Sequence, residues 1–299
     1  MLFRLISSLF VLLLLITPGL AEPISIVINP LAPVESPKIL ATEYLKKLIM
    51  ERSDGRIELT INNNSQLSTQ QILDALNTKQ FQLALLDVRD IDIMFPMLEI
   101  YDLPFMFKDR RHLHRVIDNE IGRSISRVAP DQKMQILSIW DGASRQILAE
   151  QSISTFEGDL PLFFTASRAV RSANDGDWVE CTLTDTDKLS RRTTLDTLTL
   201  TNHSFSTAAL LTHQRFWTQL PEDLKIIIIG AIEDASLYIR ELAEQADKET
   251  LQHLEKDGKI DIATLPQKER TLWRKKALTF FQNTRSQQKS HIIDTIMKN

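Results

Sequence analysis

ISIVIN at residues 24–29, RIELTI at residues 56–61 and FQLALL at residues 81–86 are three short segments rich in β-branched and other apolar side chains. Such segments are typical of β-strands. Between them, residues 37–52 and 69–78 carry apolar side chains at helical spacing. The order strand, helix, strand, helix, strand predicts an α/β fold with a mainly parallel sheet covered by helices.

Two polar residues follow strands of this predicted sheet. Asn29 ends the first strand and Asp87 ends the third. Ligands of open α/β sheets lie outside the carboxyl ends of the strands, where an amide and a carboxylate offer donors and acceptors to a polar ligand. Asn and Asp also form turns at such positions, so both explanations stay open for each residue.

Composition narrows the classes of function. The chain has 299 residues, of which 43% are hydrophobic and 25% charged, enough apolar material for one or two globular domains. There are only 8 glycines, and no GxGxxG or GxxxxGK[ST] phosphate loop occurs. A net charge of −4 argues against binding to nucleic acid or to anionic lipid. The one cysteine, Cys181, forms neither an intrachain disulfide nor a zinc site alone.

Residues 1–21 have the pattern of a secretory signal peptide. Arg4 provides the positive charge, residues 5–16 form the apolar segment, and Gly19 and Ala21 are small residues at the −3 and −1 positions of a cleavage site. The alternative, an uncleaved anchor, would need a longer apolar run, because about 20 residues are required to cross a bilayer. We therefore expect an exported mature chain with no transmembrane segment.

The longest periodic segment is near the C-terminus. Pro221, Glu222 and Asp223 suit the start of a helix, and Asp257-Gly258 suits its end. At about 1.5 Å per residue, such a helix would be about 55 Å long, longer than one small domain is wide. It therefore either spans two lobes or associates with another helix.

Several motifs occur in the order found in one family of transport proteins. They are GRIEL at 55–59, YDLPFMF at 101–107, WDG with SRQI at 140–147, LTLTNH at 198–203 and FWTQLP at 216–221. In this combination the chain resembles the solute-binding subunit of tripartite ATP-independent periplasmic (TRAP) transporters, of the dicarboxylate-binding type.

The resemblance implies a periplasmic protein of two α/β lobes, similar to type II binding proteins, with the long helix crossing both. The lobes would close on a small organic acid and the protein would then dock on membrane permease subunits. The expected first lobe comprises residues 22–143 and about 205–250, and the second comprises about 144–204 and 251–299. The resemblance implies no enzymatic activity, no cofactor, no metal and no nucleic-acid partner.

The family's central arginine, which holds the ligand carboxylate, corresponds to Arg145. A guanidinium matches a carboxylate bidentately and stays charged, although an arginine in a loop is ordinarily solvated. Asn29 and Asp87 fall where first-lobe strand ends contribute polar ligand contacts. The family's second arginine is absent, because Ala166 stands at its position; Arg168 or Arg171 replaces it only with a shifted register.

The second lobe departs from the family in a further way. The motif EvYtALqtGvvDGqEn is not recognisable, and residues 173–197 occupy a shorter interval rich in Asp, Thr and Ser. The second lobe is therefore expected to be reduced or rebuilt. This departure keeps an alternative function open, in which a degenerate binding protein acts as an exported sensor or adaptor partner without a transported ligand.

The sequence does not favour a metal site or a catalytic nucleophile. His112 and His114 lie at the start of a charged predicted helix, where their rings diverge, so they are not expected to bind a metal. No GxSxG elbow accompanies the histidines. Cys181 has acidic neighbours that would raise the pKa of its thiol, which is the wrong direction for a nucleophile.

Overall fold

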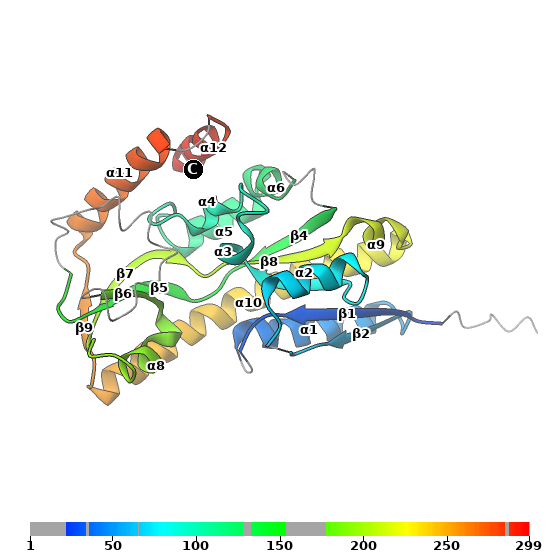
Figure 1. Cartoon of the computed structure of the whole chain (residues 1–299), viewed down its shortest axis with the longest axis horizontal. Coiled ribbons are helices and arrows are strands. Elements are labelled where there is room, and N and C mark those ends of the chain that lie inside the picture. The colour runs from blue at the N-terminus through cyan, green and yellow to red at the C-terminus, as the bar shows by residue number, and fades with distance from the viewer. Residues whose placement is uncertain are drawn as a thin grey trace, which may run out of the picture.

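The computed structural model describes residues 22–33, 36–64, 66–127, 133–153, 178–284 and 287–298. Two β-sheets lie at the two ends of an elongated molecule, and one long helix runs along both (Figure 1). The predicted signal peptide, residues 1–21, and the candidate ligand residue Arg168 are outside the described residues.

The first sheet has five strands in the order β2-β1-β3-β8-β4. Strand β1 pairs in parallel with β2 and β3, and β8 pairs antiparallel with β3 and β4, so only β8 runs against the other four. The predicted α/β class and the mainly parallel sheet are confirmed. The strands are β1 (Ile24–Pro30), β2 (Ile57–Ile61), β3 (Leu83–Asp87), β4 (Met134–Trp140) and β8 (Ala208–His213).

The first two helices are specified by local sequence. Helix α1 (Pro37–Arg52) begins after Ser36, whose side chain accepts a hydrogen bond from the Ile39 amide. Helix α2 (Thr69–Asn77) begins with a capping box in which Ser68 and Gln71 satisfy each other's backbone amides. Four shorter helices follow β3: α3 (Val88–Ile91), α4 (Glu99–Asp102), α5 (Arg110–Asp118) and α6 (Glu120–Arg127).

The second sheet has four strands in the order β6-β5-β7-β9. They are β6 (Trp178–Thr182), β5 (Ser144–Ala149), β7 (Thr197–Phe205) and β9 (Asp261–Thr264). After β6 come a 3₁₀ turn, η2 (Leu183–Asp185), and helix α8 (Thr186–Ser190). Most of the interval in which the family motif is not recognisable, from residue 178 onward, therefore contains an ordered strand, a 3₁₀ turn and a helix.

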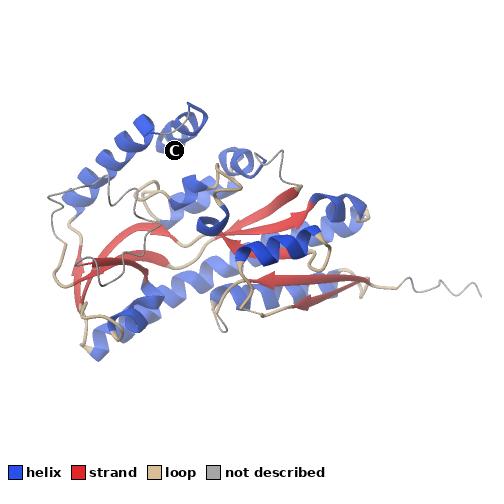
Figure 2. Ribbon diagram, viewed as in Figure 1, coloured by secondary structure: helices blue, strands red, loops and turns tan. Residues whose placement is uncertain are grey.

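Helix α10 (Glu222–Asp257) has 36 residues and ends at Gly258, whose φ of 62° is the left-handed conformation that glycine adopts readily. Its residue Ile239 belongs to a core cluster with β1, β3 and β8, and Leu254 belongs to another with β5, β6 and β7. The prediction of one long helix spanning both lobes is confirmed (Figure 2).

The C-terminal helices pack against the layer formed by α3 to α6. Trp273 and Phe281 of α11 (Gln267–Thr284) and Ile293 of α12 (Gln287–Lys298) share a core cluster with Tyr101 and Phe105. The remaining helix, α9 (Gln214–Gln219), leads into α10. Among the described residues, no helix has the length and apolar composition that crossing a bilayer requires.

Candidate functional site

The chain passes between the two sheets at two adjacent segments, residues 141–143 and residues 206–207. The Ser206 amide donates a hydrogen bond of 2.9 Å to the Ala143 carbonyl. A Cβ atom on Gly142 would lie 2.1 Å from the Ser206 carbonyl oxygen, so only glycine allows the two segments to lie this close.

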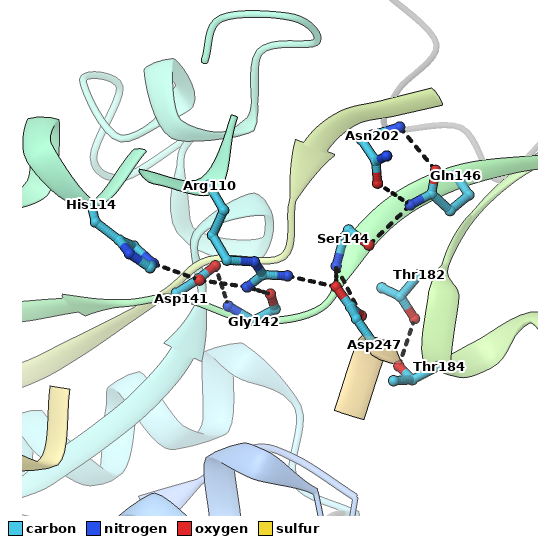
Figure 3. Close-up of polar contacts among 10 residues, drawn as sticks. All are labelled: Arg110, His114, Asp141, Gly142, Ser144, Gln146, Thr182, Thr184, Asn202 and Asp247. Atoms are coloured by element: carbon cyan, nitrogen blue, oxygen red, sulfur yellow. Dashed lines mark hydrogen bonds and ion pairs between the residues drawn. The ribbon is translucent and has the colours of Figure 1, made fainter. Parts of the chain in front are cut away.

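A network of polar contacts surrounds this crossing (Figure 3). The Arg110 guanidinium donates to the buried Asp141 carboxylate, to the Gly142 carbonyl at 2.8 Å and to Asp247 of α10. His114 Nε2 lies 2.8 Å from Asp141 Oδ2, and Asp247 accepts from the Ser144 amide at 3.0 Å. Helix α5, the first crossing segment and α10 are thereby tied together at one point.

A second set of ionisable residues, Arg89, Asp102, Arg145, Glu180 and His203, lies close together; we call it the charged cluster. Arg89 of α3 donates to Asp102 of α4 through Nε at 2.9 Å and Nη2 at 3.0 Å. The same guanidinium donates to Glu180 of β6 through Nη1 at 2.6 Å and Nη2 at 3.3 Å. Arg89 therefore links helices next to the first sheet with a strand of the second.

Arg145 of β5 lies beside the same two carboxylates without hydrogen-bonding to them. Its Nε is 3.8 Å from Asp102 Oδ1 and its Nη1 is 3.7 Å from Glu180 Oε2. The side chain is 11% exposed, and its Nε is buried without a hydrogen-bond acceptor among the described residues. A buried guanidinium with unused N–H donors is costly unless an acceptor satisfies them.

Burial and charge act in opposite directions on the two carboxyl groups of the charged cluster. Burial alone would raise the pKa of Glu180, but His203, Arg145 and Arg89 outweigh it and hold that pKa well below its usual range. Burial raises the pKa of Asp102 despite the opposing charges of Arg89 and Arg145.

His203 of β7 completes the charged cluster. Its Nε2 lies 2.9 Å from Glu180 Oε1 and its Nδ1 lies 2.7 Å from the Thr201 hydroxyl. Burial lowers the pKa of His203, and the nearby arginines add to this effect, although Glu180 opposes it. We therefore treat the imidazole as neutral near pH 7.

The other two candidate ligand residues lie at strand ends, as predicted, but have their own partners. The Asp87 carboxylate pairs with Lys38 of α1. Asn29 donates through Nδ2 to the Asn62 carbonyl at 2.8 Å, and its Oδ1 is buried with no partner among the described residues. No hydrogen bond or ion pair between described side chains joins Asn29 or Asp87 to Arg145, and Arg168 cannot be placed.

The carboxyl group of Asp90 interacts electrostatically with both Asp87 and Arg145. Burial raises the pKa of Asp90 most, followed by the charge of Asp87, whereas Lys38, Arg89 and Arg145 lower it. Sequence reasoning selected neither Arg89 nor Glu180. The one available signal was the placement of Arg89 directly after the third strand, two residues beyond Asp87.

Residues considered for other chemistry have structural partners. The His112 Nδ1 accepts from the Lys108 amide at 3.1 Å, whereas His114 faces Asp141. Burial raises the pKa of the Cys181 thiol to about 12, and the acidic neighbours add to this effect. Trp178 packs against the core cluster that contains Phe105, in keeping with a core role. No group of metal-ligating side chains occurs among residues 22–298 outside the undescribed gaps.

A surface groove of about 920 Å³ lies between α10, β4 and α6. Its lining includes Ile136, Ser138, Leu237 and Arg240, and no member of the charged cluster. The groove is therefore separate from the arginine that the resemblance selects.

The molecule has two α/β lobes, which are joined by two adjacent crossing segments and by one helix that both lobes share. A largely buried arginine lies near the junction. This combination is typical of a two-lobe solute-binding protein. The chain belongs to the bacterial extracellular solute-binding protein family 7 (DctP), whose model matches residues 28–160 and 179–288. The resemblance to TRAP solute-binding subunits is thereby confirmed.

Individual relatives agree with this assignment. The chain is 23% identical over 294 residues to the C4-dicarboxylate-binding periplasmic protein DctP of Rhodobacter capsulatus, covering 87% of this chain and 86% of that one. A TRAP periplasmic solute binding protein from Ochrobactrum anthropi superposes with a TM-score of 0.81 at 19% identity, over 93% and 95% of the two chains. The sugar acid binding protein DctPAm of Advenella mimigardefordensis, in complex with galactonate, gives 0.76 at 20% identity, over 93% and 99%.

Proposed function

We propose that this chain captures a small organic acid at Arg145 in the periplasm and delivers it to the membrane permease of a TRAP transporter. The observation that carries the proposal is the Arg145 side chain, which is 11% exposed and whose buried Nε has no acceptor among the described residues. A ligand carboxylate would supply the missing acceptors in the bidentate geometry that a guanidinium favours. The names of the relatives, which bind a C4-dicarboxylate or a sugar acid, support an organic acid as the ligand.

The remaining candidate residues have supporting roles in this proposal. Asn29 Oδ1 is a buried acceptor for which the described residues supply no donor, so it is suited to a ligand hydroxyl or amide. Asp87, with Lys38, would orient polar groups of the ligand from the end of β3. Arg168 is proposed as a second cationic contact from the other lobe.

The proposed lobe boundaries are supported by the two crossings, which fall after β4 and after β7. These positions correspond to residues 143 and 205 in the predicted division. Helices α11 and α12 share a core cluster with α4, which favours placing residues 267–298 with the first lobe and leaving residues 251–266 with the second.

The direct test is a thermal-shift screen of carboxylic acids on the mature protein, repeated with Arg145→Ala. A ligand at about 100 times its Kd stabilises the folded state by about 2.7 kcal/mol, which is a rise in Tm of a few degrees for a chain of this size. We expect at least one acid to give this rise and Arg145→Ala to abolish it.

The matched control is Arg191→Ala, because Arg191 is an exposed arginine of the same proposed lobe whose ion pair among the described residues is with Asp187. It should leave the thermal shift unchanged. If no carboxylic acid stabilises the wild-type protein, or if Arg145→Ala keeps the full shift, the proposal is wrong.

A further inference from the structure

The carboxylates of Asp102 and Glu180 are fixed beside the arginine that is proposed to hold the ligand. Both lie 3.7–3.8 Å from the Arg145 guanidinium, close enough for a charge interaction and too far for a hydrogen bond. Arg89 holds each of them with two hydrogen bonds, and His203 holds Glu180 as well. These contacts keep both negative charges in place when a ligand enters.

Most of the described cationic side chains near Arg145 already pair with a carboxylate of the protein. Lys38, Arg89 and Arg145 act on the carboxyl group of Asp90, which lies among them. Lys38 is paired with Asp87, and Arg89 is paired with both Asp102 and Glu180. Among the described residues, Arg145 is the one of these three cations for which no side-chain hydrogen bond is found. The described part of the region thus offers one unused guanidinium, which matches one carboxylate.

We propose that Glu180, together with Asp102, is a specificity-determining residue that selects ligands with a single carboxylate and an uncharged polar remainder. The inference rests on the proposed function of Arg145. A second ligand carboxylate would enter a region whose described residues already hold two fixed negative charges and no uncommitted cation, so repulsion in the low-dielectric interior would disfavour it. Arg168 is proposed to contact the same ligand carboxylate as Arg145. Hydroxyl or amide groups of the ligand would instead donate to the carboxylate oxygens.

Glu180 reaches the charged cluster from the second sheet. It lies on β6, within the second segment that the family model matches. Its partner Arg89 is 91 residues earlier in the sequence. The selection would therefore depend on a pair of residues that the pairing of β6 with β5 brings together.

Succinate and succinamate are suitable probes, because they differ in one carboxylate that an amide of similar shape replaces. We expect the wild-type protein to bind succinamate more tightly than succinate in calorimetric titrations at pH 7.5. In Glu180→Gln, which removes one negative charge and keeps the side-chain shape, the ratio of the two affinities should move toward succinate by about tenfold or more.

Three further variants make the experiment decisive. Glu180→Asp keeps the charge and should keep the preference for succinamate. Glu241→Gln removes an exposed charge on α10 and should leave the ratio unchanged. Asp102→Asn should shift the ratio in the same direction as Glu180→Gln, so a folding failure of one variant still leaves a test.

A ratio that stays within twofold of wild type in both Glu180→Gln and Asp102→Asn overturns this inference, and leaves the proposed function standing if Arg145→Ala abolishes a thermal shift. Absence of binding of both probes to the wild type and to both variants also overturns it. The proposed function fails separately, when no acid in the wider screen stabilises the protein.

Discussion

Arg89 and Arg145 face the same two carboxylates, and the difference between them illustrates how a binding protein keeps one charge ready for its ligand. Arg89 donates four hydrogen bonds, two to Asp102 and two to Glu180. Among the described residues, the desolvation of Arg145 is compensated by ion pairs of 3.7–3.8 Å, and its Nε has no acceptor. The unused hydrogen-bonding capacity of Arg145 is then available to a ligand.

At the same scale, His203 makes stability depend on pH. Burial lowers the pKa of His203 in the folded protein, whereas in the unfolded chain it has the ordinary value of about 6.5. Below this value the unfolded state binds the proton more readily, so stability falls as the pH decreases toward the folded-state pKa, by up to about 1.4 kcal/mol per pH unit.

Urea unfolding between pH 8 and pH 5 would measure this effect. His203→Gln should flatten the profile, leaving the contribution of His112, whose pKa burial also lowers. An unchanged pH profile in His203→Gln would show that the imidazole of His203 does not resist protonation.

At the scale of elements, α5, the first crossing segment and α10 are held together through one guanidinium. Arg110 faces Asp141, which is fully buried, and Asp247, whose pKa burial raises although Arg110 and the Ser144 amide oppose the rise. Because Gly142 lies against Ser206, the crossing has no room to rearrange around a missing partner. The contacts of Arg110 therefore set the position of the long helix relative to the crossing (Figure 3).

Arg110→Met should reduce the free energy of unfolding by about 3–5 kcal/mol, because it leaves the buried Asp141 carboxylate and the partly buried Asp247 carboxylate without this arginine. Arg240→Met is the matched control on α10. Its partner Asp118 is 56% exposed, so the loss should be below about 1 kcal/mol. Urea unfolding monitored by circular dichroism measures both, and equal losses would contradict the assigned role of Arg110.

At the scale of the whole molecule, three core clusters hold the chain together. One lies between α1, α10 and the first sheet, one lies under the second sheet, and the largest joins α2 to α6 with α11 and α12. The C-terminal helices therefore stabilise the layer that carries Asp102, although they begin 165 residues later in the sequence, at Gln267. Substitutions in α11 or α12 that disturb this packing are therefore expected to change the position of Asp102 in the charged cluster.

The predicted signal peptide leads to a prediction about the N-terminus of the mature protein. We expect cleavage after Ala21, so the mature protein from a periplasmic fraction should begin at Glu22, as intact-mass spectrometry would show. Ala21→Phe places a bulky residue where a small one is needed, and a longer precursor should accumulate. Wild-type protein that retains residues 1–21 in the membrane fraction would contradict the prediction.

The sequence by itself determined the α/β class, the positions of the first three strands and two helices to within about two residues, and the length of α10. It also selected Arg145 as the carboxylate anchor, which stays a prediction. These features depend on periodicity, on caps such as Ser36 and Ser68, and on motifs read along the chain, all of which are local. The expectation that Asn29 and Asp87 end their strands had the same local basis, and their contact with a ligand stays a prediction.

Only the tertiary structure decided which charged side chains lie close together. β8 lies antiparallel between β3 and β4, and β6 lies antiparallel beside β5. That pairing brings Glu180 to Arg89, across 91 residues of sequence. Long-range contacts of this kind follow from how whole elements pack, and no local pattern encodes a partner so distant. The family motifs thus indicate a carboxylate anchor, and the fold sets the negative charges that surround it.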